Sequence, residues 1–280
     1  MSSSRPRRLG GQGAGSRHGH TLRAAQARPF AAPGLVLVLL FGVPILVTLV
    51  TGLGNNFLVF VRAPEALAAL RLSLVTSTAA LFATVLLGTP LAYFFALTKF
   101  PGRWLLELIV DLPIVLPPAV AGLALLMTFG RRGFLGSALG QLGLSLPFTT
   151  WAVILAQIFV AAPFFVRAAR VGFAAIDVHL AESALVEGAS PWQLFVLIML
   201  PLARRALITG LILAWTRALG EFGATILFAG NLEGVSQTMP LAIYIGFEQN
   251  SNSALALAVI LIALSALLMT GLRRLEDHED

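Results

Sequence analysis

Six apolar stretches, each of about 20 residues, dominate this chain of 280 residues. A helix that crosses the hydrocarbon core of a bilayer needs about that length, because every backbone N–H and C=O must be satisfied inside the segment. The composition agrees, with 58% hydrophobic residues, 11% charged residues and a mean hydropathy of +0.88. We predict an all-α, polytopic integral membrane protein with six transmembrane helices. The predicted spans are residues 35–53, 72–97, 105–129, 149–171, 206–229 and 254–272.

The basic residues indicate how these spans are oriented. Although the net charge is +6, six arginines lie in the first 28 residues, so the charge describes a tail rather than a nucleic-acid-binding patch. With the N-terminus in the cytoplasm, 14 of the 19 lysines and arginines fall on the cytoplasmic side, as the positive-inside rule favours. We therefore predict a multi-pass protein of the inner or plasma membrane, with both termini cytoplasmic and no nucleic-acid partner.

The N-terminal residues 1–30 are rich in Arg, Gly and Ser and lack acidic residues. This composition predicts a disordered basic cytoplasmic tail before a six-helix domain of residues 31–280. The apolar run that follows is longer than a signal-peptide core and has no cleavage pattern after it, which favours an anchor; an organelle transit peptide is the alternative. Cysteine is absent, so thiolate metal ligands are excluded, and we expect no metal site.

Residues 181–201, AESALVEGASPWQLFVLIMLP, form a polar interruption between two apolar spans. Asp177 is a good N-cap, and strong helix formers follow it. The expected helix is about 15 Å long, half the thickness of the hydrocarbon core, so it cannot span a membrane.

A turn and a second helix start follow this short helix. Gly188 stands where a left-handed residue ends a helix. Ser190, Pro191 and Gln193 then form the pattern of an N-cap, a proline at the first helical position and a capping-box partner. The pattern predicts a rigid elbow over residues 177–201 on the cytoplasmic side. An amphipathic hairpin that lies on the lipid headgroups is the alternative.

The elbow also resembles a known family. Its pattern is similar to the Glu-Ala-Ala…Gly…Ile-x-Leu-Pro loop of ATP-binding-cassette importer permeases, with a serine in place of the first alanine. The matching positions are Glu182, Ser183, Ala184, Gly188, Ile198, Leu200 and Pro201. The resemblance implies that the short helix is a coupling helix that docks on a separate ATPase subunit. The residues implied in coupling to the ATPase are Glu182, Ser183, Ala184, Gly188, Ala189 and Ser190.

Nucleotide hydrolysis is not expected of this chain. A phosphate-binding loop needs the pattern G-x-x-x-x-G-K-S/T, and the one lysine, Lys99, has no such glycines before it. We therefore expect no catalytic residues, no enzyme activity and no cofactor in this chain, with ATP and Mg bound by the partner ATPase. The resemblance further implies a second copy of the chain, two ATPase subunits and an extracytoplasmic oxyanion-binding protein as partners.

Prolines interrupt the third predicted span, DLPIVLPPAVAGLALL (residues 111–126). Pro113, Pro117 and Pro118 remove backbone donors that lipid cannot replace. Such breaks persist where neighbouring protein or a wet cavity satisfies the freed carbonyls, which predicts a place on a translocation pathway. A kink that only aids packing is the alternative.

Charges also interrupt the fifth predicted span, where Arg217 and Glu221 lie one helical turn apart. Each costs about 2.5–3.5 kcal/mol near the bilayer centre, so we expect them to pair, to face a polar path, or both. An ion pair that only locks helix packing is the alternative. The flanking glycines permit a local opening, and threonine hydroxyls are candidate donors to an anion unless they bond the carbonyl four residues back. The predicted pathway residues are Arg217, Gly220, Glu221, Gly223, Thr225, Pro117 and Pro118.

Three further stretches are similar to the oxyanion branch of these permeases, the molybdate and sulfate permeases: LPIVLPPAVAGLALL, ALGEFGATILFAGN and GVSQTMPLAIY. The QTMP turn followed by LAIY is nearer to molybdate permeases, and the resemblance covers about residues 70–272. It implies import of molybdate, with tungstate included, and sulfate or thiosulfate is the alternative. Because a binding protein would carry selectivity, the residues of this chain do not separate these anions.

Two alternative functions, from other classes of membrane protein, stay open. A secondary transporter or channel would work without nucleotide and use the Arg217–Glu221 pair as a charge relay, whereas a membrane scaffold would transport nothing. Some molybdate permeases carry a cytoplasmic regulatory domain after the last span. Only eight residues follow Leu272 here, so we expect that mode of inhibition to be missing.

Overall fold

The protein is described by a computed structural model over residues 15–54, 56–249 and 251–276. All regular elements in these ranges are helices, which confirms the predicted all-α class. The chain divides into two compact units, Met1–Thr51 and Gly52–Asp280, which are described separately. Five of the described helices are long and apolar enough to cross a membrane.

The first unit consists of helix α1, which runs from Gly15 to Gly52. Its apolar part, Ala32–Gly52, has a hydropathy of 2.6 and coincides with the first predicted span. The backbone is already helical over residues 15–30, where the sequence predicts disorder, and residues 1–14 lie outside the described part of the chain. A domain boundary at residue 30 stays a prediction.

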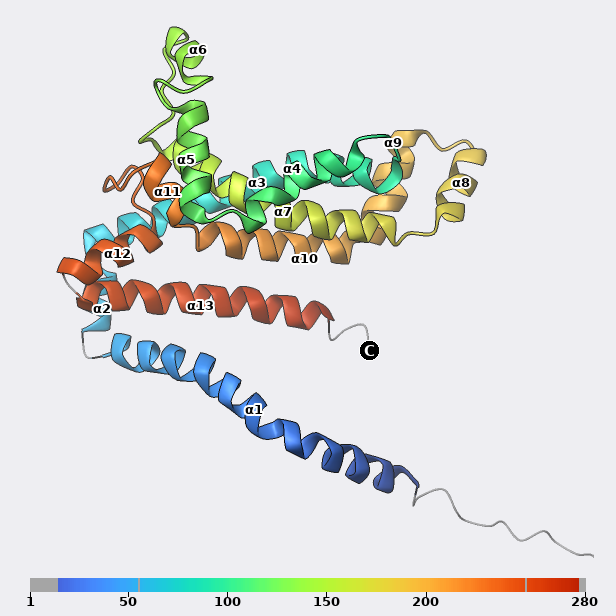
Figure 1. Ribbon diagram of the computed structural model, residues 1–280, viewed down its shortest axis with the longest axis horizontal. Coiled ribbons are helices and arrows are strands. Elements are labelled where there is room, and N and C mark those ends of the chain that lie inside the picture. Colours follow the sequence, from blue (N-terminus) through green and yellow to red (C-terminus); the bar gives the residue numbers. More distant parts are fainter. Residues whose placement is uncertain (1–14, 55, 250, 277–280) are drawn as a thin grey trace, which may run out of the picture. The chain divides into compact units, whose positions relative to one another are not determined.

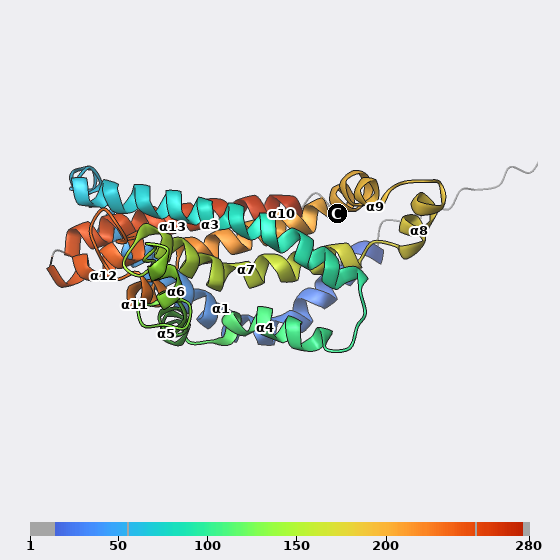
Figure 2. The same ribbon diagram turned by 90° about the horizontal axis from the view of Figure 1, so that it is seen from above.

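Four long helices of the second unit lie side by side (Figures 1 and 2). They are α3 (Pro64–Leu97), α7 (Thr150–Ala174), α10 (Leu200–Leu219) and α13 (Ser251–Glu276). Helix α7 is central: it packs against both α3 and α10, and 56% of its apolar stretch is buried. Small residues line its contacts, as is usual where membrane helices approach closely. The buried small residues of these three helices include Ala80, Gly88, Ala92, Ala156, Ala161, Ala169, Ala203, Gly210, Ala214 and Ala218.

Enlarging a small residue in this seam should destabilise the bundle. A Cβ on Gly172 of α7 would meet the Cβ of Ala206 on α10 well inside van der Waals contact. We expect Gly172→Leu to lower the thermal unfolding midpoint in detergent, since overpacking typically costs about 1–3 kcal/mol. Gly271→Leu on α13 is the matched control, because nothing lies within 4 Å of a Cβ there. Equal midpoints for the two variants would contradict this packing.

The third predicted span, residues 105–129, is not one helix. It is divided into α4 (Arg103–Val115) and α5 (Pro118–Phe129), and the chain changes direction between them (Figure 1). At about 1.5 Å per residue each piece is shorter than 20 Å, so neither crosses a 30 Å core alone. Leu116 and Pro117 are extended, because a proline disfavours helical geometry in the residue before it. The prolines had marked this interruption in the sequence, and the structure shows that it divides the span into two short helices.

The fifth predicted span, residues 206–229, also differs from the structure. Helix begins earlier, at Pro191, and ends at Leu219. After Gly220–Phe222 a separate short helix, α11 (Gly223–Phe228), follows. The membrane-crossing helix is therefore displaced toward the elbow relative to the prediction.

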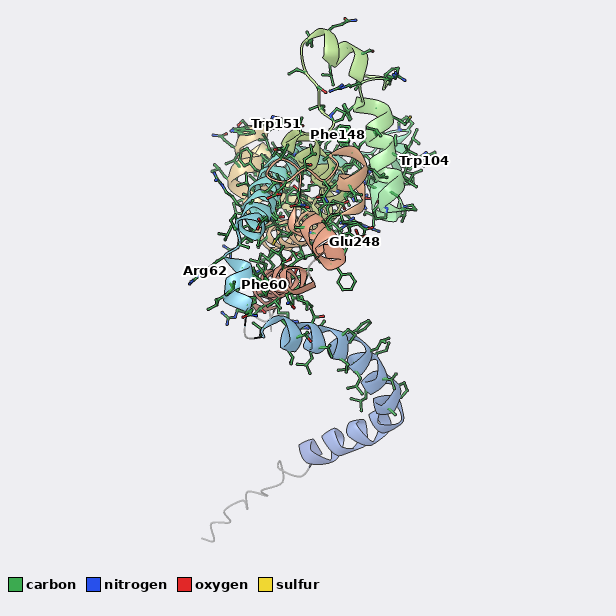
Figure 3. The ribbon with its side chains drawn as sticks, turned by 90° about the vertical axis from the view of Figure 1, so that its left-hand side faces the viewer. Phe60, Arg62, Trp104, Phe148, Trp151 and Glu248 are labelled. Atoms are coloured by element: carbon green, nitrogen blue, oxygen red, sulfur yellow. The ribbon has the colours of Figure 1, made fainter. Side chains whose placement is uncertain are left out.

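The short elements gather at the two ends of the long helices (Figures 1 and 2). Helices α8 (Val178–Val186) and α9 (Pro191–Gln193) lie at one end, which we call the elbow end. The elements at the opposite end are α2 (Phe57–Val61), α6 (Gly136–Gln141), α11 and α12 (Met239–Gln249). On α4, the side chain of Trp104 points away from the bundle and is 68% exposed (Figure 3).

Candidate coupling surface and candidate translocation site

Local hydrogen bonds build the first arm of the elbow as the sequence predicts. The Asp177 carboxylate accepts from the His179 N–H at 2.9 Å and caps the start of α8. At the other end, Gly188 has φ +95°, its N–H donates to Leu185 O, and the Ala189 N–H donates to Ala184 O. This pair of bonds is the Schellman arrangement that ends many helices at a left-handed glycine.

The second arm starts with a complete capping box. The Ser190 hydroxyl accepts from the Gln193 N–H at 3.2 Å, and the Gln193 side chain accepts from the Ser190 N–H at 2.8 Å. Pro191 occupies the first helical position, where no N–H is needed. The predicted elbow geometry is therefore confirmed, and short-range contacts alone specify it.

The predicted coupling residues lie on or beside the surface of α8. Glu182, Ser183, Gly188 and Ser190 are exposed. Ala184 and Ala189 are half-buried, and Ala184 packs against the core together with Ala181. The Glu182 carboxylate lies 3.5 Å from the His179 ring, but both side chains are mostly exposed, so the contact adds little stability.

Large apolar side chains are also exposed around the elbow. Val186 is 88% exposed and Trp192 is 71% exposed, and Val178, Leu180 and Leu185 join them. Exposed apolar groups beside polar ones mark interaction surfaces in soluble environments. These exposed side chains make the elbow a candidate docking surface.

A π-turn lies in the second arm of the elbow, directly before α10. Residues Leu194–Met199 form a π-helix, η1, in which the Leu200 N–H reaches back five residues to Phe195 O. It directly precedes Pro201, whose ring would crowd the carbonyl of Leu197 in a regular α-helix. The proline was visible in the sequence, but its effect on the turn before it was not predicted.

The break between α10 and α11 is closed by a buried carboxylate. Glu221, 1% exposed, accepts from the Ala224 N–H at 2.8 Å through Oε1 and so caps α11. Its Oε2 lies 2.8 Å from Arg217 Nη1, an ion pair without hydrogen-bond geometry. From α7, the Gln157 side chain donates to Ala218 O at 3.2 Å. Gln157 was missed in the sequence, although a lone amide inside an apolar span was a signal.

The two helix breaks lie against each other. A Cβ on Gly223 would lie 2.5 Å from Pro118 Cβ, and a Cβ on Gly122 would lie 2.8 Å from Ala224 O. Only glycine permits these approaches, because the contacts on Gly122 include backbone atoms. The structure thus brings the α4–α5 break and the α10–α11 break together.

The predicted pathway residues separate into accessible and buried ones. Pro117, Pro118 and Gly220 are exposed, and the Arg217 side chain is 29% exposed. Glu221 and Thr225, at 1% and 0% exposure, are enclosed within this chain.

Two threonine hydroxyls of this region differ in their hydrogen bonding. Thr216 donates to the carbonyl of Ile212, four residues back, at 2.8 Å, so its hydrogen is used within the helix. The Thr225 hydroxyl is buried without a hydrogen-bond partner.

The described helices, five of them long and apolar enough to cross a membrane, define a polytopic helical membrane protein. Residues 88–278 match the family described as binding-protein-dependent transport system inner membrane component. The chain belongs to this family, which confirms the resemblance found in the sequence.

Relatives with described roles agree with this family. The chain is 40% identical over 222 residues to the molybdenum transport system permease protein ModB of Mycobacterium tuberculosis, covering 77% of this chain and 82% of that protein. It is 39% identical over 200 residues to ModB of Escherichia coli, covering 70% and 87%. The sulfate transport system permease protein CysT of Escherichia coli is 33% identical over 216 residues, covering 77% and 78%.

Solved structures share the fold. A bacterial ABC transporter involved in the import of the acidic polysaccharide alginate has a chain with TM-score 0.72 and 18% identity, covering 94% of this chain and 98% of that one. The MetNI methionine ABC transporter, in an inward-facing form, gives TM-score 0.56 and 20% identity, covering 74% and 92%.

Proposed function

We propose that this chain is the membrane-spanning subunit of an ATP-driven molybdate importer. The observation that supports the coupling role is the capped elbow. Helix α8 is capped at both ends, carries exposed apolar groups and lies at one end of the long helices. Names of relatives support the substrate, since ModB proteins match at 39–40% identity and the sulfate permease CysT at 33%. Tungstate is expected to share the route because it is the same kind of tetrahedral oxyanion.

The proposed assembly has two copies of this chain, two ATPase subunits and an extracytoplasmic binding protein. The elbow end is cytoplasmic in this proposal, which places the basic residues near it on the side favoured for positive charge. Both termini are cytoplasmic, and residues 1–30 precede the permease domain of residues 31–280. The ATPase supplies ATP and Mg chemistry, and this chain is a non-catalytic transport subunit.

In this proposal α8 and its turn couple to the ATPase, and the paired helix breaks form part of the translocation pathway. Arg217, Pro117, Pro118, Gly220 and Gly223 would face the anion's route first, since they are wholly or partly accessible. Glu221 and Thr225 would reach it only after the breaks separate. ATP-driven motion of the elbow by rigid-body displacement would cause that separation.

Reconstitution with the partner ATPase and binding protein tests the function. Uptake of radiolabelled molybdate into proteoliposomes should require ATP and stop with vanadate, and unlabelled tungstate should compete better than sulfate. Uptake that survives vanadate would support the secondary transporter instead. Competition dominated by sulfate would support the sulfate permease, for which the similarity to CysT is the motivating observation.

A further inference from the structure

Aromatic rings join the elbow to two long helices. The Phe195 ring, in η1, lies 4.7 Å from the Tyr93 ring of α3 and 6.3 Å from the Phe173 ring of α7. Tyr93 and Phe173 meet edge to face, with centroids 5.3 Å apart and planes at 78°. We call these three side chains the aromatic junction. Such ring pairs contribute directional contact beyond apolar burial, and each ring has only two torsions to adjust.

The aromatic junction also contacts both arms of the elbow. The exposed Trp192 ring of α9 lies 5.7 Å from Phe195. Helix α8 packs against η1, and its Ala181 and Ala184 pack against the core cluster that contains Phe173. A displacement of α8 would therefore act directly on η1.

Phe195 stands at the point where these contacts converge. It belongs to the π-turn, whose hydrogen bonds differ from those of the helices on either side. Met199 and Leu194, at the two ends of this turn, are 2% and 5% exposed, so the turn is anchored in the core. A turn of this kind inside an α-helix is frequently found at functional sites.

We propose that Phe195 is the positioning residue that transmits movement of the elbow to α3 and α7, through its contacts with Tyr93 and Phe173. This inference rests on the proposed function. It adds the contacts inside the protein through which a movement of the elbow would reach α3 and α7. Because closely packed rings resist compression, a push on η1 displaces α3 and α7 together rather than being absorbed locally. Removing the Phe195 ring leaves the exposed residues of α8 in place but removes the contacts that would pass a movement of η1 to α3 and α7.

The test uses the complete transporter in proteoliposomes and measures ATP hydrolysis and radiolabelled molybdate uptake together. Phe195→Ala should still bind the ATPase and hydrolyse ATP. The number of ATP hydrolysed per molybdate imported should rise about tenfold, within the range found for residues that mediate coupling between sites. Phe195→Leu, which keeps apolar volume but no ring, should show the same direction of change, and Phe195→Tyr should restore the wild-type ratio.

The matched control is Phe82→Leu, because Phe82 lies on α3 but is 71% exposed and away from the aromatic junction. It should leave the ratio unchanged. The inference is overturned if Phe195→Ala and Phe195→Leu assemble and keep the wild-type ratio of ATP hydrolysed to molybdate imported. It is also overturned if Phe195→Ala lowers hydrolysis and uptake in parallel, because Phe195 then has a structural role only. Failure of the proposed function is distinguishable, since the wild-type chain would then show no ATP-dependent uptake at all.

Discussion

Gly188→Pro should reduce molybdate uptake to background while the chain still inserts into the membrane. Proline fixes φ near −65°, whereas Gly188 has φ +95°, and proline also removes the N–H that donates to Leu185 O. The turn between α8 and α9 would therefore be rebuilt, and the docking surface would lose its shape. Co-purification of the ATPase with the tagged chain and uptake in proteoliposomes measure the two effects.

Gly234→Pro is the matched control for the backbone change. Gly234 also has a left-handed backbone, with φ +72°, but lies far along the chain from the elbow, and nothing lies within 4 Å of a Cβ there. The ATPase should still co-purify with this variant.

Glu182→Lys tests the surface without changing the backbone, since it reverses an exposed charge, and it should also weaken ATPase association. Normal assembly and uptake in both elbow variants would refute the coupling role.

Glu221→Leu should have the second large effect, a loss of folded protein. The substitution removes the cap of α11 and leaves Arg217 without its partner in a largely apolar setting. Breaking a buried ion pair by removing one partner typically costs about 3–5 kcal/mol. Yield and thermal midpoint in detergent measure the loss. Glu233→Leu, at an exposed carboxylate, is the control and should be close to wild type.

The double variant Arg217→Gln with Glu221→Gln separates packing from transport. It removes both charges and keeps an oxygen that can accept from Ala224. Stability should return to near the wild-type value, because no uncompensated charge remains. If uptake returns as well, the pair only locks the α10–α11 break. If stability returns without uptake, Arg217 acts on the anion, as its partial exposure favours in our proposal. A double variant as unstable as Glu221→Leu would contradict the ion-pair account.

The elbow was predictable from sequence because its geometry is local. Asp177, Gly188 and the capping box of Ser190 each act on neighbours within five residues, so composition and spacing contain the required information. Five of the six predicted spans correspond to long helices at approximately the predicted positions, since length and hydropathy decide them.

Burial inside the membrane region could not be predicted in the same way. Lipid-facing and protein-facing positions are both apolar, so hydropathy does not separate exposed Phe82 from buried Phe165. The sequence also did not show that Glu221 and Thr225 are enclosed while Pro118 is accessible, because burial depends on which helices pack together. The approach of Gly223 to Pro118 joins residues more than a hundred positions apart, which spacing alone cannot reveal.

The seam of alanines and glycines between α7 and its neighbours has a kinetic consequence. These residues have no χ torsions, so a shift of one helix past another requires no exchange of rotamers along the contact. Large side chains interrupt this seam, among them Phe165 of α7, which packs against Gly88 of α3, and the aromatic junction near the elbow end. Rotamer changes during such a shift would therefore be confined to these larger side chains.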